Sequence, residues 1–229
     1  MGIDNGKTAA IIKVSEYSLN GVGMKKRFDE FLEKRKLDIV TAVLKLVDRV
    51  GVAGVTTKRI AHEVGFVEGA LYKHFNSKNE IFHRLLEIAE MQVNDKFKEM
   101  DTRGLDPGQW LREWFVFVIA YLEDFPGIYR ILFSDALYNE DKELFNKFKS
   151  ITWNLKERLE GMIRIGSERN IFRPDVTPET SAIMYLGMIH TSFTLWNVFE
   201  ERSKSLRDIS RPLFAEFMNS LLLDKEAVQ

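Results

Sequence analysis

The chain has 229 residues and a formal net charge of -1, and 45% of its residues are hydrophobic and 29% are charged. This balance is ordinary for a globular protein of one or two domains, and it excludes a wholly disordered chain. The longest apolar run, Trp114 to Leu122, has nine residues, whereas a helix that crosses a bilayer needs about 20. The lack of cysteine excludes disulfides and thiol catalysis and fits a reducing, cytoplasmic setting.

The charges are distributed unevenly along the chain. Residues 1–80 carry 14 Lys and Arg against 10 Asp and Glu, whereas residues 81–229 carry 19 against 24. A basic first third joined to an acidic remainder indicates that only the first part meets a polyanion. A charge excess of this size also arises by chance. It supports binding to a polyanion only where a sequence motif points the same way.

Apolar residues recur with helical spacing, whereas the alternation typical of strands is scarce. Gly, Pro and residues suited to N-caps divide this pattern into segments. The segment around 110–122 is apolar on all sides, which is typical of a buried central helix. In chain order we predict an apolar stripe over 39–50 that can extend back to Phe28, a helix from Thr56 or Thr57 to Gly65, a third around 71–75, and others over 77–100, 110–122, 128–137, 141–168, 178–199 and 207–223.

Residues 56–76 have the pattern of a helix-turn-helix. Ala61 is small enough to let two helices approach, and Gly65 suits the left-handed backbone of the turn. Apolar residues such as Ile60 and Leu71 would hold the pair together, although a short helix-loop-helix within a bundle has similar features. The second-helix residues that then face outward are Val67, Glu68, Gly69, Ala70 and Lys73. A recognition helix contacts base edges in the major groove with residues in such positions.

The run Leu71-Tyr72-Lys73-His74-Phe75, followed by Lys78, resembles the TetR family of bacterial transcriptional regulators. The resemblance covers about 50 residues, from Arg35 to Glu87, and is supported by the phrase Asn170-Ile171-Phe172-Arg173-Pro174-Asp175. It implies an all-α chain with an N-terminal three-helix, helix-turn-helix DNA-binding domain and a C-terminal helical bundle for ligand binding and dimerisation. We therefore expect a partly flexible N-terminal extension over 1–33, the DNA-binding domain over 34–80, and the ligand-binding and dimerisation domain over 81–229.

The resemblance also implies contacts with DNA that agree with the chemistry of the residues. Thr57 and Lys58 open the first motif helix, where helix-end amides can hold a phosphate. Glu68 could accept from a cytosine amino group or remain a solvated charge. Instead of contacting DNA, Tyr72 could pack against hydrophobic neighbours and His74 could cap the end of a helix. The predicted DNA-binding residues are Thr56, Thr57, Lys58, Val67, Glu68, Gly69, Ala70, Tyr72, Lys73, His74 and Lys78.

Aromatic residues are concentrated in the second half of the chain. Residues 105–199 hold 17 of the 27 aromatic side chains and all four tryptophans. Core packing explains many of them, but a helical bundle can also enclose an apolar ligand with such residues. We expect a hydrophobic small-molecule effector rather than a sugar. The predicted ligand-binding residues are Trp114, Phe117, Tyr121, Phe133, Trp153, Met184, Met188 and His190.

These features predict a homodimeric, ligand-responsive repressor that a hydrophobic small molecule releases from a palindromic operator in double-stranded DNA. The last two helices, over 178–199 and 207–223, are expected to form the dimer seam. A ligand-independent DNA-binding architectural or cell-division factor on the same fold is the alternative, as is an all-α enzyme or carrier with a coincidental motif. Because hydrolase and nucleotide-binding signatures are missing and the histidines lie on different helices, we expect no catalytic residue, metal or cofactor, and no membrane partner.

Overall fold

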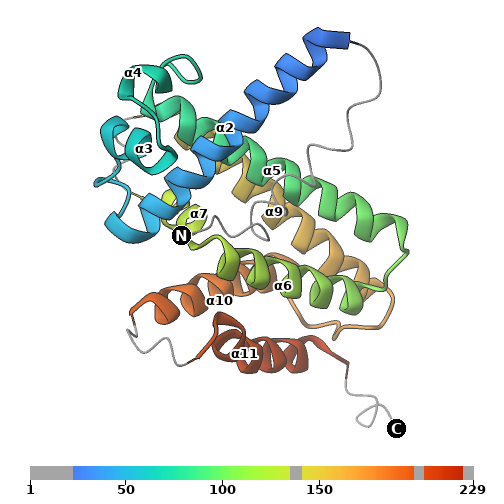
Figure 1. The fold of residues 1–229 in the computed structure, drawn as a ribbon. Coiled ribbons are helices and arrows are strands. Elements are labelled where there is room, and N and C mark those ends of the chain that lie inside the picture. The colour runs from blue at the N-terminus through green and yellow to red at the C-terminus, as the bar shows by residue number, and fades with distance from the viewer. Residues whose placement is uncertain (1–22, 135–140, 199–203, 224–229) are drawn as a thin grey trace, which may run out of the picture. The chain divides into compact units, whose positions relative to one another are not determined.

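The described part of the chain is all-helical (Figure 1). The computed structural model describes residues 23–134, 141–198 and 204–223, with side chains from residue 34 onward. Within these ranges there is no strand, only an isolated bridge between Phe172 and Leu222, and no helix has the length and hydropathy of a membrane span. The helices are α2 (Gly23–Val50), α3 (Thr57–Val64), α4 (Glu68–Leu71), α5 (Lys78–Thr102), α6 (Pro107–Asp124), α7 (Pro126–Leu132), α9 (Lys142–Glu168), α10 (Pro178–Val198) and α11 (Leu206–Leu221).

Most helix ends lie within three residues of the predicted ones, but α2, α4 and α7 differ. Helix α2 begins at Gly23, five residues before Phe28, the farthest point to which the predicted stripe extends. Helix α4 has only four residues and continues as a turn rather than as helix to Phe75. Helix α7 was predicted over 128–137, but it begins at Pro126, because proline is favoured at the first helical position. Gly127 also belongs to this helix, and a Cβ there would lie 2.6 Å from the carbonyl oxygen of Leu44 in α2. The Pro-Gly pair therefore starts a closely packed helix instead of interrupting one.

Residue contacts divide the chain into two compact units. The first unit consists of the residues up to Asn94 together with Phe125–Phe148, and the second consists of Asp95–Asp124 together with the residues from Lys149 onward. Helices α5 and α9 contribute residues to both units. The sequence suggested a different boundary, between residues 80 and 81, which separates a DNA-binding from a ligand-binding domain. This functional boundary stays a prediction.

The core of the first unit forms where α2 packs against α3 and α7. Ile39, Val43 and Val47 follow one another along the buried side of α2, and Ile60 of α3 is equally inaccessible to solvent. Full burial of each such side chain contributes about 1.5–3 kcal/mol relative to exposure. Because α4 is joined to α3 by a short turn and buries Leu71, this core fixes the orientation of both motif helices.

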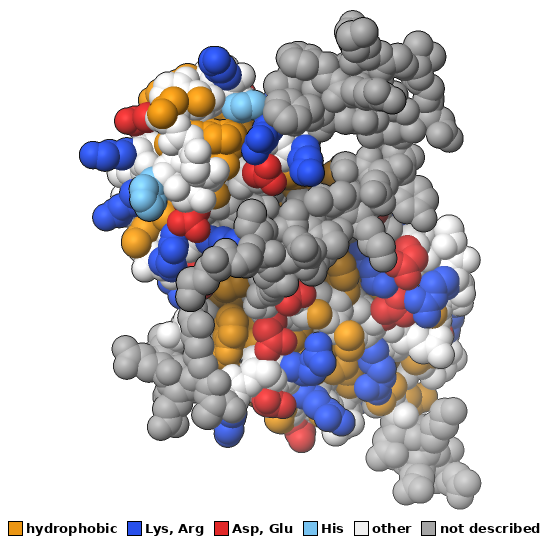
Figure 2. Space-filling view, in the orientation of Figure 1, with side chains coloured by type: hydrophobic (Ala, Val, Ile, Leu, Met, Phe, Trp, Pro, Cys, Tyr) orange, Lys and Arg blue, Asp and Glu red, His pale blue; other side chains and the backbone are white. Residues whose placement is uncertain are grey.

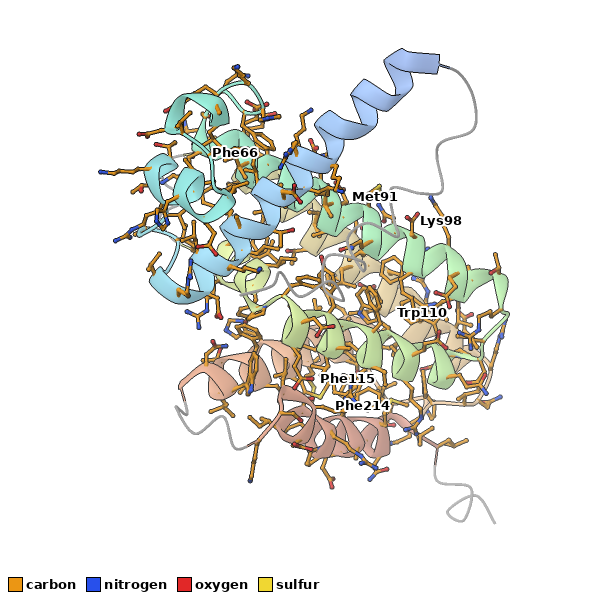
Figure 3. All side chains as sticks on the ribbon, in the orientation of Figure 1. Phe66, Met91, Lys98, Trp110, Phe115 and Phe214 are labelled. Atoms are coloured by element: carbon orange, nitrogen blue, oxygen red, sulfur yellow. The ribbon has the colours of Figure 1, made fainter. Side chains whose placement is uncertain are left out.

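The core of the second unit is arranged around α6, which contacts α11, while α11 contacts α10. The rings of Phe115 and Phe214 are stacked, with centroids 4.1 Å apart, and Figure 3 shows them facing each other between α6 and α11. The buried hydroxyl of Tyr185 donates to the carbonyl oxygen of Leu111 at 2.8 Å. The prediction that α6 is surrounded on all sides is only partly right, because Val116 is 60% exposed.

Asp141 joins two helices of the first unit. Its Oδ1 atom accepts from the backbone N–H of Leu144 at 2.9 Å, which caps the start of α9. Its Oδ2 atom lies 3.0 Å from Nε2 of His83 in α5. The hydrogen bond from Leu144 and then that from His83 hold the pKa of Asp141 below its ordinary value, because both favour the charged carboxylate.

The replacement Asp141→Asn keeps an oxygen for the cap but removes the charge. Because the pKa of Asp141 is lower in the folded than in the unfolded chain, its charge stabilises the fold above about pH 4 and loses this effect as the pH falls through the folded pKa. We expect D141N to lower the free energy of unfolding by about 1 kcal/mol at pH 7, and the difference to shrink at pH 3. Urea denaturation at both pH values measures it.

The matched control is Asp95→Asn, which removes an exposed carboxylate that pairs with exposed Lys98 in α5. This pair is expected to contribute little at either pH. A D141N defect of equal size at pH 7 and pH 3 would show that the charge is not its cause.

Candidate functional site

The first motif helix, α3, is held by caps at both ends. The side chain of Thr56 accepts from the backbone N–H of Arg59 at 3.3 Å, as expected of an N-cap. Arg59 in turn donates to the carbonyl oxygen of Gly54 at 2.6 Å. At the other end Gly65 has φ 76° and ψ 31°, the left-handed conformation that glycine adopts without steric cost. The predicted helix and both of its signals are confirmed.

The turn after α3 places α4 across it. The backbone N–H of Phe66 donates to the carbonyl oxygen of Ala61 at 2.8 Å, which closes the turn, and Ala61 is buried. Leu71 and Phe75 are buried on the inner side of α4 and of the turn that follows it. The backbone N–H of Phe75 donates to the carbonyl oxygen of Leu71 at 3.1 Å, so the chain stays tightly coiled beyond the end of α4.

The outer side of this motif carries most of the residues predicted to contact DNA. Val67 is 77% exposed and Tyr72 is 51% exposed, so both side chains of the motif are accessible to a partner. In the part of Figure 2 that corresponds to α3 and α4, side chains of Lys, Arg and His project from the surface. The exposed predicted residues are Thr56, Lys58, Val67, Glu68, Gly69, Tyr72 and Lys73, and the half-buried ones are Thr57, Ala70, His74 and Lys78.

Thr57 and Glu68 bind each other instead of pointing separately into solvent. The hydroxyl of Thr57 donates to Oε1 of Glu68 at 2.5 Å, which joins the first turn of α3 to the first turn of α4. In this state the carboxylate is already hydrogen-bonded on one oxygen. The predicted contact with a cytosine amino group would use the other oxygen of Glu68. This contact stays a prediction.

Positive charge from a second helix gathers near the end of the motif. Burial, and then the charges of Arg35, Lys36 and Lys73, lower the pKa of His74 from its ordinary value. The ring of His74 stacks on that of Phe66, with centroids 6.0 Å apart. Because the imidazole is neutral near pH 7, the surrounding lysine and arginine side chains are the charges that would attract a phosphate here.

The start of α5 completes this surface. The backbone N–H of Glu80 donates to the hydroxyl of Ser77 at 3.1 Å, which is one half of a capping box. The carboxylate of Glu80 accepts from the backbone N–H of Asn76, at 2.6 Å, and thus reaches one residue further back than the simple pattern suggests. The Nζ atom of Lys78 lies 5.9 Å from the ring centre of Phe82. Lys78 therefore lies in the first turn of a capped helix, a position suited to phosphate.

The second unit contains a continuous cluster of aromatic rings, here called the aromatic cluster, formed by Phe97, Trp110, Trp114, Phe117 and Tyr121. The ring of Phe97 lies 5.5 Å from that of Trp110 and 4.5 Å from that of Trp114. From Trp114 the contacts continue to Phe117 at 5.4 Å and on to Tyr121 at 5.8 Å. Burial raises the pKa of Tyr121 well above its ordinary range. Figure 3 labels Trp110 within this region.

Two members of the aromatic cluster have unpaired polar groups. Trp110 and Trp114 are each 1% exposed, and within the described residues neither indole N–H has a hydrogen-bond partner. Buried polar groups in proteins are nearly always paired, and leaving one unpaired costs about 1–3 kcal/mol. An unpaired buried group therefore calls for an explanation, such as strain or a functional role.

Charged side chains of both signs surround the aromatic cluster. Nζ of Lys96 lies 2.8 Å from a carboxylate oxygen of Glu113 and 5.9 Å from the ring centre of Phe117. The hydrogen bond from Lys96 holds the pKa of Glu113 below its ordinary value, and burial opposes this effect. The guanidinium of Arg158 lies 5.0 Å from the ring centre of Phe97 and is paired with Asp101.

The other predicted ligand-binding residues are not part of this cluster. Trp153 is exposed, and its indole N–H donates to Glu157 at 2.8 Å. Phe133 belongs to the first unit, where its ring stacks on that of Tyr129. Met184 and His190 are exposed on α10, where Met188 is half-buried. Of the eight predicted residues, the structure brings together Trp114, Phe117 and Tyr121, and ligand contact stays a prediction for all of them.

Sequence reasoning missed residues in both regions. Arg35 and Lys36 act electrostatically on the motif from α2, and the basic run around them was a signal that could have identified them. Trp110 shares the helical spacing of Trp114 and could have been included on that ground. Phe97 could not, because its contact with the tryptophans depends on how α5 meets α6. No group of three His, Asp or Glu suited to a metal ion lies within the described ranges.

Comparison with known proteins agrees with this geometry. A family described as bacterial regulatory proteins, tetR family, matches residues 39–85. The nucleoid occlusion factor SlmA of Marinobacter nauticus is 32% identical over 148 residues, which make up 65% of this chain and 74% of that protein. SlmA of Vibrio campbellii is 28% identical over 159 residues, covering 69% of this chain and 81% of that protein.

Two solved structures are similar over nearly their whole length. The ketosteroid transcriptional regulator KstR2 of Mycobacterium tuberculosis has a TM-score of 0.73 at 16% identity, over 83% of this chain and 96% of that chain. The transcriptional regulator FadR of Bacillus subtilis, in complex with stearoyl-CoA, has a TM-score of 0.66 at 16% identity, over 80% and 98%. They confirm the predicted fold, with an N-terminal helix-turn-helix and a C-terminal helical domain. With its capped α3, its left-handed glycine turn and these relatives, the chain belongs to the TetR family of bacterial regulatory proteins.

Proposed function

We propose that this DNA-binding regulator of the TetR family acts as a homodimeric repressor, which a hydrophobic small molecule releases from a palindromic operator. The observation that carries the DNA-binding part is the exposed outer side of α4, where Val67 stands in solvent beside Glu68 and Gly69. A rigid helix that presents such residues fits the major groove. Lys58, Lys73 and Lys78 would bind phosphates on either side and fix the register.

The dimer is proposed from the exposed side of α10. Ile183 and Met184 are each 55% exposed, and a Cβ at Gly187, one turn further on, would meet nothing within 4 Å. On α11 the apolar side chain of Leu213 is exposed as well. A second copy of this chain would cover these surfaces in a four-helix seam. Two recognition helices would then meet half-sites about 34–36 Å apart, or a multiple of this distance.

The response to an effector is proposed from the aromatic cluster. Apolar rings with two unpaired N–H groups offer the combination of hydrophobic surface and a few polar groups that small-molecule sites use. The effector would bind a conformation that does not fit the operator. Its influence on DNA binding would equal its difference in affinity for the two conformations.

A second candidate function is supported by the relatives. SlmA of Marinobacter nauticus is a nucleoid occlusion factor, and it is similar over 74% of its own length. On this reading the chain would bind DNA as a cell-division factor without a small-molecule effector. The same α3–α4 surface would bind DNA in both cases. The two functions therefore differ in the role of the second unit, and an apolar effector that lowers DNA affinity would favour the repressor.

Replacing the two exposed lysines of the motif tests the proposed DNA surface. In the double variant Lys58→Ala and Lys73→Ala, we expect weaker binding to every duplex, because phosphate contacts carry no sequence information. The plot of log affinity against log salt concentration should become less steep by about 0.9 for each lost phosphate contact. Fluorescence anisotropy with a random-sequence duplex and a duplex selected from genomic fragments measures both effects.

The matched control for this experiment is Lys98→Ala, which removes a 78% exposed lysine of the second unit. This variant should bind both duplexes with the affinity and salt dependence of the unmodified chain. The proposed surface is wrong if the double variant and this control bind alike.

The proposed seam predicts a change of oligomeric state in the variant Ile183→Glu. A carboxylate buried between two copies of α10 would be unpaired, so dimerisation should be lost. The control Val116→Glu introduces the same charge at a 60% exposed apolar position on α6 and should leave the dimer intact. Sedimentation velocity distinguishes monomer from dimer. Equal behaviour of the two variants would place the seam elsewhere.

A further inference from the structure

The unpaired groups in the aromatic cluster are hydrogen-bond donors only. An indole N–H cannot accept, so each requires an acceptor atom. In the described structure no acceptor lies within reach of either Trp110 or Trp114, although the protein encloses both side chains. The two rings lie nearly parallel, at 23°, with centroids 6.4 Å apart. An occupant that brings an oxygen acceptor to this place would satisfy donors that the protein itself leaves unpaired.

The surfaces around these donors are aromatic. Phe97 lies against both indole rings, and Phe117 and Tyr121 continue the cluster along α6. Flat rings stack well on such surfaces, in offset or edge-on arrangements. A partly aromatic or otherwise flat apolar body therefore fits this environment better than a flexible polar one.

The charges next to the aromatic cluster are already balanced. Lys96 and Arg103 share the carboxylates of Glu99 and Glu113. Arg158 is paired with Asp101 in the same unit. These ion pairs join three cations to three carboxylates, so they leave no surplus positive charge for an acidic head group. A neutral acceptor is therefore favoured over a carboxylate or a phosphate.

We propose that the aromatic cluster binds a neutral, flat apolar molecule through a carbonyl oxygen that accepts from the indole N–H of Trp114, of Trp110, or of both. This inference rests on the proposed effector response and specifies its chemistry. A ketone, a lactone or a quinone has the required group, whereas a hydrocarbon of the same shape lacks it. The carbonyl accepts without adding charge to an environment that is already neutral.

Access to this site requires the rings to move. Both indole nitrogens are sealed from solvent in the described conformation, so a ligand meets them only after the cluster opens. The closed state leaves two donors unpaired, and the liganded state pairs at least one of them. This difference favours the opened conformation when a carbonyl compound is present, which is the kind of differential affinity that a ligand-driven switch needs.

Three probes of related shape test the proposal on the full chain: benzophenone, diphenylmethane, which lacks the carbonyl, and 4-benzoylbenzoate, which adds a carboxylate. Calorimetry should give benzophenone the highest affinity, about tenfold above diphenylmethane, as one hydrogen bond predicts. The variants Trp114→Phe and Trp110→Phe, made singly, keep an aromatic ring but remove the N–H. At least one should lower benzophenone affinity about tenfold and leave diphenylmethane affinity within about twofold.

The control variant is Trp196→Phe, which changes a half-buried tryptophan outside the aromatic cluster and should alter neither affinity. The proposal is overturned if diphenylmethane binds as tightly as benzophenone, if 4-benzoylbenzoate binds most tightly, or if none of the three binds. It is also overturned if both cluster variants lose both probes equally, since that result would reflect packing alone.

Duplex binding by the same unmodified sample separates this inference from the proposed function. If the sample binds genomic duplex but shows no preference for the ketone, only the carbonyl site is wrong. If it binds no duplex at any salt concentration, the proposed regulator is wrong, whatever the ketone does.

Discussion

The left-handed backbone at Gly65 is the constraint on which the rest of the proposed DNA-binding surface depends. It reverses the chain within one residue, so that α4 leaves α3 at a steep angle and returns Leu71 to the core. A side chain at Gly65 would meet no atom within 4 Å, so space does not require glycine there, but φ at 76° does. The exposed position of Val67 follows directly, because the residues that begin α4 cannot reach the core from this turn.

Buried polar groups are not all paired in either unit. In the first unit side chains cap the starts of α3 and α5, but Nδ1 of His74 is buried without a partner among the described residues. In the aromatic cluster two indole N–H groups are enclosed without an acceptor. A core that served stability alone could hold phenylalanine in both places. These two enclosed N–H groups are the physical reason for the binding role that we propose for the aromatic cluster.

Much of the fold was predictable because its signals are local. Helix α3 begins after Thr56, which caps it, and ends before Gly65, which favours the left-handed backbone. Neither effect depends on residues distant in sequence. The early end of α4 was not predictable, because Leu71 and Phe75 keep helical spacing while the backbone between them already forms a turn. The predicted break at Pro126 does separate α6 from α7, but Pro126 and Gly127 belong to α7 itself, because proline can begin a helix as well as follow one.

The candidate sites also differ in whether local sequence signals can predict them. Exposure of Val67 and Tyr72 follows from a short motif with one buried side, and spacing alone can identify that side. The proposed effector region depends instead on how α5 and α6 meet. The sequence singled out Trp114, Phe117 and Tyr121, but it could not show that Phe97 completes the cluster or that Trp153 faces solvent. The pairing of an indole N–H is likewise decided by residues distant in sequence.

The most direct test of the central claim is amide hydrogen exchange, measured on the purified chain with and without a bound duplex. The account predicts slower exchange in the peptides that span Val67 to Phe75 when the duplex is present, because α4 and the turn after it would be enclosed in the groove. Protection confined to other segments, with the 67–75 peptides unchanged while the duplex is bound, would contradict it.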